Sequence, residues 1–337
     1  MEAAARMAGN QAVPRLKNLS LRQLRYFLEV AQLHSFTRAA EVLHIAQSAL
    51  SRQIRLLEEE LGLALFNRYD RGVTLTEAGE RMRDRVTVLL KDLDALRVDL
   101  VDGRDTPHGE LSVGMPPSLR EIMTVPLMVD YCRAFPAVGL HVHEGISIDL
   151  LKPVQEGALD CAVVVDLMAV PRLSTVPLMR ERLYLIGPGT AKLNSRRAIS
   201  LSQVAAQPLI LTMRPNSLRL VVDNALAAAG LTPTIVADSN STAAMVDLAA
   251  EGMAYTVLPY SAAWRAVGSG QLSAAPIANL TIDWVFVHPT ARRLSSAARA
   301  FVQALLSLAR RRVAEKSWPG ATVPSAGTSD QNGMPSI

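Results

Sequence analysis

Residues 35–62, which read SFTRAAEVLHIAQSALSRQIRLLEEELG, are the segment that most constrains how this chain can fold. They predict a short helix near residues 36–43, with Ser35 as its N-cap, and a second helix that begins near Gln47. An apolar stripe recurs along the second helix at steps of four, three and four: Leu50, Ile54, Leu57 and Leu61. This stripe faces a small core and thereby determines which residues of the helix face outward.

The outward face of the second helix carries hydrogen-bonding side chains: Gln47, Ser48, Ser51, Arg52 and Arg55. In the major groove of DNA, Arg matches the acceptors of guanine, Gln matches adenine, and hydroxyl groups pair with either kind of edge. We therefore expect a helix-turn-helix whose second helix reads base edges of duplex DNA. A solvated helix face without a partner has the same periodicity, and the spacing alone leaves that alternative open.

The sequence on either side of this segment extends the motif. Residues 21–31 predict a supporting amphipathic helix, and residues 65–79, LFNRYDRGVTLTEAG, alternate like a two-stranded wing before a new helix starts. Without a gap, residues 19–100 resemble the winged helix-turn-helix and the following helix of the LysR-type transcriptional regulators. The resemblance implies a DNA-binding transcriptional regulator.

The resemblance also implies a role for each polar residue of the motif. Four residues would contact bases: Gln47, Ser48, Ser51 and Arg52. Arg38 and Arg55 would lie at phosphates, and the wing would reach the DNA backbone or minor groove through Arg68 and Arg71. Many members of the family have Ser-Gln-Pro where this chain has Ala-Gln-Ser at residues 46–48, so Ser48 would either cap the helix or read DNA.

Residues 77–101 predict one long helix with a seven-residue apolar repeat. Its apolar positions are spaced alternately by four and three: Met82, Val86, Leu89, Leu93, Leu96 and Leu100. Such a repeat describes a seam that another helix fills, and a homodimer would supply both that helix and a two-fold axis for two DNA half-sites. The alternative is packing of this helix on its own sensor domain. The resemblance implies paired linker helices and a homotetramer joined through the sensor domains.

The second half of the chain has an α/β pattern. From residue 110 short apolar runs alternate with helix-like segments, which predicts largely parallel strands. The resemblance implies a two-lobed effector domain similar to the periplasmic binding proteins, with lobe one at 109–183 plus 286–313 and lobe two at 184–285. We expect the chain to begin with a disordered arm (1–18) and a winged helix-turn-helix (19–76), which is all-α apart from its β wing. A linker helix (77–101), a hinge (102–108), the effector domain (109–313) and a disordered tail (314–337) follow.

Strand-to-helix junctions that face the cleft between the lobes are the candidate contacts for a small molecule. They are Met115, Ser118, Ile146, Ser147, Val165, Asn216, Ser217, Asn240 and Thr242. Helix N-termini favour anions and apolar side chains surround these positions, so we expect a small, partly hydrophobic effector that carries a carboxylate. Ser and Asn at helix starts are also ordinary caps, and each of these residues taken alone is open to that interpretation.

Composition limits the other classes of protein. The net charge is +4, but residues 14–72 hold nine Lys/Arg against six Asp/Glu, so overall basicity says little about DNA binding. The two cysteines and six histidines lack metal-site spacing, and the sequence has no phosphate-binding glycine loop, nucleophile elbow or Cys-x-x-Cys motif. We therefore expect no cofactor, no metal and no enzymatic activity.

Location and partners follow from the same patterns. No apolar run is long enough for a membrane span and no secretory signal occurs, so we expect a cytoplasmic protein without a membrane partner. Its expected partners are promoter DNA, a small effector, further copies of itself and, at the promoter, RNA polymerase. A solute-binding transport component remains an alternative, but it would need export and would leave the helix-turn-helix unused.

Overall fold

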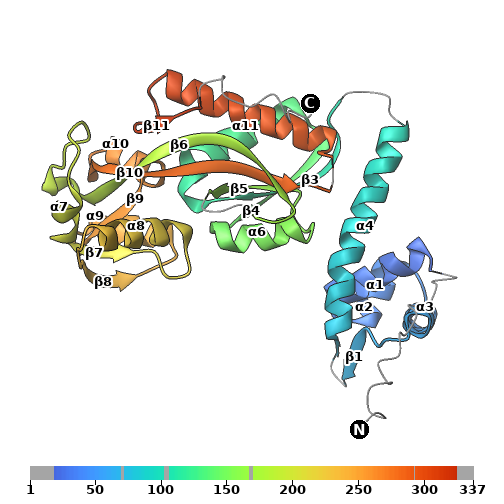
Figure 1. Ribbon diagram of the computed structural model, residues 1–337. Helices are drawn as coiled ribbons and strands as arrows, with labels where there is room; N and C mark the ends of the chain where they lie inside the picture. The colour runs from blue at the N-terminus through green and yellow to red at the C-terminus, as the bar shows by residue number, and fades with distance from the viewer. Residues whose placement is uncertain (1–18, 70–71, 102–105, 167–169, 292, 325–337) are drawn as a thin grey trace, which may run out of the picture. The chain divides into compact units, whose positions relative to one another are not determined.

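The computed structural model describes residues 19–69, 72–101, 106–166, 170–291 and 293–324. The chain divides into two compact units, Met1–Asp102 and Gly103–Ile337 (Figure 1). Each unit has its own hydrophobic core. The division falls within the expected hinge at residues 102–108, of which residues 102–105 lie outside the described set.

The first unit is a winged helix-turn-helix, as the sequence predicts. Its elements are α1 (Leu21–Leu33), α2 (Phe36–Val42), α3 (Gln47–Leu61), β1 (Phe66–Tyr69), β2 (Gly72–Leu75) and α4 (Glu77–Val101). The apolar stripe of α3 is buried, because Leu50, Ile54 and Leu57 are 0% exposed in the core of this unit. Ser35 accepts a hydrogen bond from the backbone N–H of Arg38 and caps α2, as expected.

Helix α4 packs part of its apolar repeat within its own unit. Val86 and Leu90 are buried against Leu24 of α1. Leu89 is 45% exposed. The expectation that the whole repeat faces a second helix is therefore wrong for Val86, because α1 already covers that side chain. Two later positions of the repeat have side chains outside the described set: Leu96 and Leu100.

The second unit is built on one mixed sheet with the strand order β4-β3-β5-β10-β6-β9-β7-β8, and β11 pairs with β6 beside this path (Figure 1). The strands are β3 (Gly109–Met115), β4 (Val138–Glu144), β5 (Cys161–Val165), β6 (Leu173–Pro188), β7 (Pro208–Leu211), β8 (Thr234–Asp238), β9 (Tyr255–Pro259), β10 (Leu272–Pro289) and β11 (Ala321–Thr322). Neighbouring strands are parallel at both ends of the sheet, whereas β6 and β10 are antiparallel to each other and to their other neighbours. The long strands β6 and β10 thus connect two α/β lobes, and β10 already pairs with β5 of lobe one at Trp284, before the expected boundary at residue 286.

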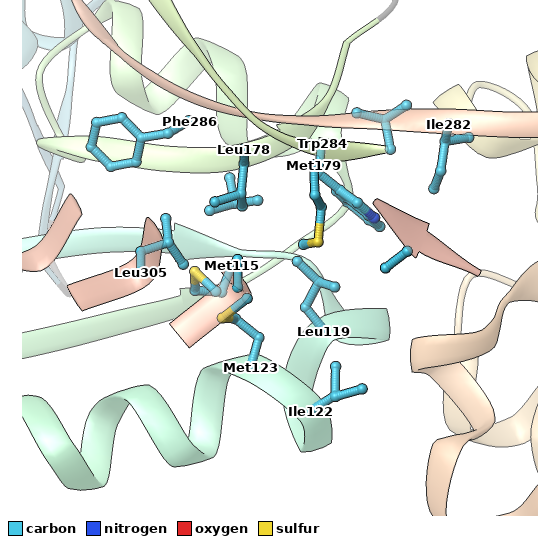
Figure 2. Packing of buried hydrophobic residues seen from close by; sticks show 14 of the residues in the cluster. Met115, Leu119, Ile122, Met123, Leu178, Met179, Ile282, Trp284, Phe286 and Leu305 are labelled. Carbon is cyan, nitrogen blue, oxygen red and sulfur yellow. The ribbon is translucent and has the colours of Figure 1, made fainter. Parts of the chain in front are cut away.

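Helices cover both lobes. The helical segments are η1 (Pro117–Leu119), η2 (Arg120–Thr124), α5 (Val125–Ala134), α6 (Ser147–Gln155), η3 (Gly189–Ala191), α7 (Leu201–Ala205), α8 (Ser217–Ala228), α9 (Thr242–Ala250), η4 (Tyr260–Ala263), α10 (Trp264–Gly268) and α11 (Ser296–Ala314). Residues of α5 and α11 belong to the main core, whereas α6 packs on β5 over a separate apolar cluster. Figure 2 shows part of the main core, where Met115, Leu119 and Met123 lie near side chains of β6 and β10.

The chain beyond α11 folds onto the sheet, so the expectation of disorder for residues 314–337 is wrong for its first part. Ala314 still belongs to α11, and Trp318 is only 2% exposed. Strand β11 then pairs with β6 at Glu181. The content of Pro, Gly and Ser suggested disorder, but a buried tryptophan and an available strand edge hold this segment. Residues 1–18 and 325–337, also expected to be disordered, lie outside the described residues.

Candidate functional site

The outward face of α3 is the candidate DNA-reading surface. Four of the predicted side chains are exposed: Gln47, Ser48, Arg52 and Arg55. The fifth, Ser51, is half-buried. Ala46 is the N-cap of α3 and provides no side-chain hydrogen bond. Ser48 lies inside the first turn with its side chain exposed, which favours the DNA-reading interpretation over the capping one. Arg38 on α2 is exposed as well.

Arg68 in β1 folds back toward the recognition helix. Its guanidinium carbon lies 4.9 Å from the centroid of the Phe36 ring, and its Nη1 donates to Ser51 Oγ at 3.5 Å. Its Nη2 is 3.8 Å from Glu58 Oε2, and 45% of the side chain stays exposed. These contacts hold Arg68 beside α3, and its contact with DNA stays a prediction. Arg71 lies outside the described residues.

Glu58 joins α3 to the wing, a role that its place in the sequence does not predict. Its Oε1 accepts hydrogen bonds from the backbone N–H groups of Leu65, at 2.8 Å, and Phe66, at 3.2 Å. Because these two groups precede and begin β1, the wing is anchored to the recognition helix. The hydrogen-bond partners of Glu58 are backbone groups, which every residue has, so the pattern of side chains in the sequence cannot predict them. The folded chain identifies them.

The residues expected at the effector cleft divide between two cavities in the second unit. Cavity 1 has a volume of about 410 Å³, and three expected residues line it: Ser118, Asn240 and Thr242. Cavity 2 has a volume of about 390 Å³, and three others line it: Val165, Asn216 and Ser217. The expectation that Ser118, Asn216 and Thr242 hold one ligand together is therefore wrong. The segments that follow β3 and β8 line cavity 1, whereas those that follow β5 and β7 line cavity 2.

Three of the expected contacts line neither cavity. Met115 is 1% exposed and belongs to the core, so its assignment to the cleft is wrong (Figure 2). Ser147 is buried, and its Oγ accepts a hydrogen bond from the backbone N–H of Val165 at 3.0 Å, so its assignment is also wrong. Ile146 serves as the N-cap residue of α6.

Some of the polar residues at these junctions are helix caps. Asn216 Oδ1 accepts a hydrogen bond from the N–H of Leu218 at 2.8 Å, and Ser241 Oγ accepts one from Ala244 at 3.2 Å. The ordinary interpretation of Asn216 as a cap is therefore confirmed. The residue after each of these caps, Ser217 in α8 and Thr242 in α9, still lines a cavity.

Cavity 1 is polar and carries more acidic than basic residues. Its charged lining consists of Arg120, Glu121, Glu144, Asp247 and Arg265. Both arginines approach Glu121, with nitrogen–oxygen distances of 3.9 Å for Arg120 and 3.8 Å for Arg265. Three carboxylates against two guanidinium groups leave an excess of negative charge in this cavity.

Cavity 2 has an apolar floor and a charged rim. Its apolar lining includes Ile148, Leu151, Val164, Val165, Val170, Leu220, Val285 and Val287. At the rim, Arg214 Nε and Nη2 donate to Asp223 Oδ2 at 2.8 and 2.6 Å. Burial alone would raise the pKa of Asp223, but hydrogen bonds from Arg219 and Arg214 outweigh it and hold this pKa below its usual value. Asp166 also lines this cavity, so two carboxylates stand against one guanidinium group, and the Arg214 side chain is 71% exposed.

Comparisons with known proteins cover both units. Residues 104–310 match the LysR substrate binding domain, and residues 21–80 match the bacterial regulatory helix-turn-helix protein of the lysR family. The chain belongs to the LysR family. It is a DNA-binding transcriptional regulator with a substrate-binding domain, which confirms the function that the sequence resemblance implied.

Individual relatives match most of this LysR-family chain. It is 30% identical over 305 residues to the nitrogen assimilation regulatory protein nac of Escherichia coli, covering 88% of this chain and 98% of that protein. The nac protein of Klebsiella aerogenes is 31% identical over 300 residues, covering 87% and 96%.

Solved structures have the same fold. Full-length OxyR from Pseudomonas aeruginosa matches with a TM-score of 0.68 at 24% identity, covering 87% of this chain and 95% of that one. Full-length CbnR in complex with its target DNA matches with a TM-score of 0.62 at 20% identity, covering 87% and 99%. The predicted architecture, a winged helix-turn-helix followed by a two-lobed α/β domain, is confirmed.

Three further features of the described part of the chain concern membrane spans, metal sites and cysteines. None of the helices there combines the length and the apolar character that a membrane span needs. Among the same residues, no group of three His, Cys, Asp or Glu side chains is arranged to hold a metal ion. Cys161 is buried, whereas Cys132 is exposed on α5.

Proposed function

We propose that this LysR-family regulator reads an operator through α3. In this proposal Gln47, Ser48, Ser51 and Arg52 contact bases, Arg38 and Arg55 contact phosphates, and the wing reaches the DNA backbone or minor groove through Arg68 and Arg71. The observation that supports it most is the burial of the α3 stripe, because fully buried Leu50, Ile54 and Leu57 leave one face of the helix for the DNA. The proposed role is to regulate transcription in contact with RNA polymerase, and not to catalyse a reaction. Because its proposed target is promoter DNA, the proposed location of this protein is the cytoplasm.

The operator is expected to be an interrupted inverted repeat near the promoter of the gene for this protein. Two copies of α3 related by the two-fold axis of a dimer would each read one half of the operator, because the symmetry of a dimeric protein is matched by the symmetry of its DNA site. Genome-wide mapping of bound fragments tests this expectation. Enriched fragments without a shared repeat would contradict the proposed mode of reading, and the enriched sites would also identify the regulated genes.

The proposed assembly is a homodimer through α4 and a homotetramer through the second units. Exposed Leu89 supports the dimer, because it belongs to the seven-residue repeat but is not covered within its own unit. The tetramer is supported by exposed apolar side chains on α5 and on the edge strand β8: Val125, Val129, Ile235 and Val236.

The proposed effector is a small, partly hydrophobic carboxylate bound in cavity 2. The apolar floor suits a hydrocarbon part, while exposed Arg214 and the N-terminus of α8 at Ser217 favour a carboxylate at the rim. A ligand held between lobes regulates transcription only if it binds one arrangement of the assembly better than another. Cavity 1 is the second candidate site, and net charge does not distinguish it from cavity 2, because carboxylates outnumber guanidinium groups in both.

A thermal-shift screen of small organic acids with two variants distinguishes the cavities. Leu220→Glu places a carboxylate on the wall of cavity 2 at a residue that is 48% exposed, so the fold tolerates it while an anionic ligand is repelled. We expect affinity to fall about tenfold or more, which reduces the shift in Tm, whereas Ser118→Ala in cavity 1 retains the wild-type shift. The opposite pattern would assign the ligand to cavity 1.

A further inference from the structure

A buried carboxylate lies at the junction of the two lobes. Glu181 in β6 is 0% exposed, and each of its carboxylate oxygens accepts two hydrogen bonds. Oε1 accepts from the backbone N–H of Ser261 at 2.9 Å and from Trp318 Nε1 at 2.8 Å. Oε2 accepts from Ser261 Oγ at 3.1 Å and from Trp284 Nε1 at 2.8 Å. All four donors are uncharged, so hydrogen bonds alone replace the water that the carboxylate has lost.

The three donor residues come from three different parts of the second unit. Trp284 belongs to the half of β10 that pairs with β5 of lobe one. Ser261 belongs to η4 of lobe two and lines cavity 1. Trp318 belongs to residues 317–323, which follow α11 and which we name the C-terminal strap. Burial raises the pKa of Glu181, and the hydrogen bonds from Trp318, Ser261 and Trp284 oppose that effect.

The strap covers β6 at the point where the lobes meet. Ala321 and Thr322 pair with Glu181 and Arg180, and the N–H of Arg182 donates to Gly320 O at 3.0 Å. The pairing of β6 with β9 begins just beyond, at Leu183. The strap thus occupies the edge of β6 next to lobe two.

The crossing strands are irregular at the same level. The register between β6 and β10 shifts between Pro276 and Thr281, where β10 has extra residues, and Ala278 N–H in this stretch donates to Ile199 O at 2.9 Å. A bulge of this kind bends the strand and increases its local twist. Glu181, which pairs with Ile282, therefore lies next to this irregularity.

The strap also requires a glycine. Gly320 has a φ of +80°, a conformation that other residues rarely adopt. A Cβ atom there would lie 2.7 Å from the hydroxyl oxygen of Tyr184 and 3.0 Å from a carbon of its ring. The close approach of the strap to β6 thus depends on this residue.

We propose that the C-terminal strap is a latch on the movement of the two lobes, with Glu181 as the residue that couples it to them. A change in lobe spacing moves Ser261 of lobe two relative to Trp284 of lobe one, and Glu181 cannot keep all four hydrogen bonds in both arrangements. Loss of any donor leaves a buried carboxylate under-bonded, so the position of the strap and the position of Ser261 depend on each other. The proposal rests on the proposed function only in that an effector bound between the lobes changes their spacing.

Hydrogen exchange of the full-length protein, measured by mass spectrometry, tests the coupling without any effector. Trp318→Phe keeps an aromatic ring but removes the indole N–H, and we expect exchange on the order of tenfold faster in peptides that contain Ser261. Ser261→Ala removes the hydroxyl donor, and we expect faster exchange in the strap, because coupling between two sites is reciprocal.

Tyr131→Phe is the matched control. Its hydroxyl donates to Ala297 O at 2.7 Å in lobe one, so the variant also loses one buried hydrogen bond but touches neither Glu181 nor the strap. Exchange at Ser261 is expected to stay at the wild-type rate. If Trp318→Phe accelerates exchange only within the strap, or if Tyr131→Phe accelerates Ser261 equally, the latch is refuted.

Two truncated chains supply an independent test. A chain that ends at Pro324 keeps the strap, whereas one that ends at Glu315 lacks it, and only the shorter chain is expected to show faster exchange at Ser261. Equal exchange in both chains would overturn the proposal. Because these measurements use no ligand, the latch can fail while the thermal-shift screen still supports effector binding, and the reverse is equally detectable.

Discussion

Arg52→Ala is expected to abolish the preference of this protein for its operator, whereas Arg55→Ala weakens binding to all DNA alike. Arg52 lies on the exposed face of α3 among the proposed base-reading residues, and a bidentate Arg–guanine pair contributes about 1–3 kcal/mol of discrimination. Arg55 lies one turn further along the same helix and is proposed to contact phosphate. Loss of a phosphate contact lowers affinity without regard to sequence and reduces the dependence of binding on salt.

Mobility shifts on the mapped operator and on a scrambled duplex, each at several salt concentrations, distinguish the two roles. Arg85→Ala on α4 is the control, because it removes the same charge from an exposed position outside the α3 face. Equal relative losses on both duplexes for Arg52→Ala and Arg55→Ala would show that neither residue reads a base.

Leu89→Glu is expected to separate the dimer into monomers that bind the operator weakly. Leu89 is 45% exposed and is not part of the packing between α4 and α1, so the variant leaves the first unit folded. In a dimer seam the new carboxylate would be buried without a partner, which costs at least roughly 3 kcal/mol and raises the dissociation constant about a hundredfold or more. Sedimentation or light scattering across a range of concentrations measures the change.

Leu56→Glu is the matched control for this experiment. Leu56 is 41% exposed on α3, so the same substitution is made at a similar exposure but away from the α4 seam. It is expected to keep the wild-type mass. An unchanged mass for Leu89→Glu would mean that α4 does not form the dimer interface.

Local patterns in the sequence predict the first unit well. The stripe on α3 depends on helical periodicity and on a few neighbouring elements, so its buried and exposed faces follow directly from residue spacing. Val86 differs, because a seven-residue repeat does not reveal which helix covers it, and α1 is the element that does.

Contacts between distant segments are less visible in the sequence. The division of the expected effector residues between two cavities depends on which strand ends face each other across the lobes. Glu181 illustrates the same limit in another way. It alternates in phase with buried Met179 and Leu183, so the period-two pattern of β6 directs it inward, but its donors lie 80, 103 and 137 residues away.

The C-terminal strap is folded onto β6, which has a consequence for the design of chimeric regulators. An exchange of effector domains that takes its C-terminal boundary from the end of α11 would transfer Glu181 without Trp318. The recipient would then carry a carboxylate that lacks one of its donors and a β6 edge open to pairing with another chain. A functional module of this protein therefore extends through residue 324, and a purification tag or reporter belongs after that point.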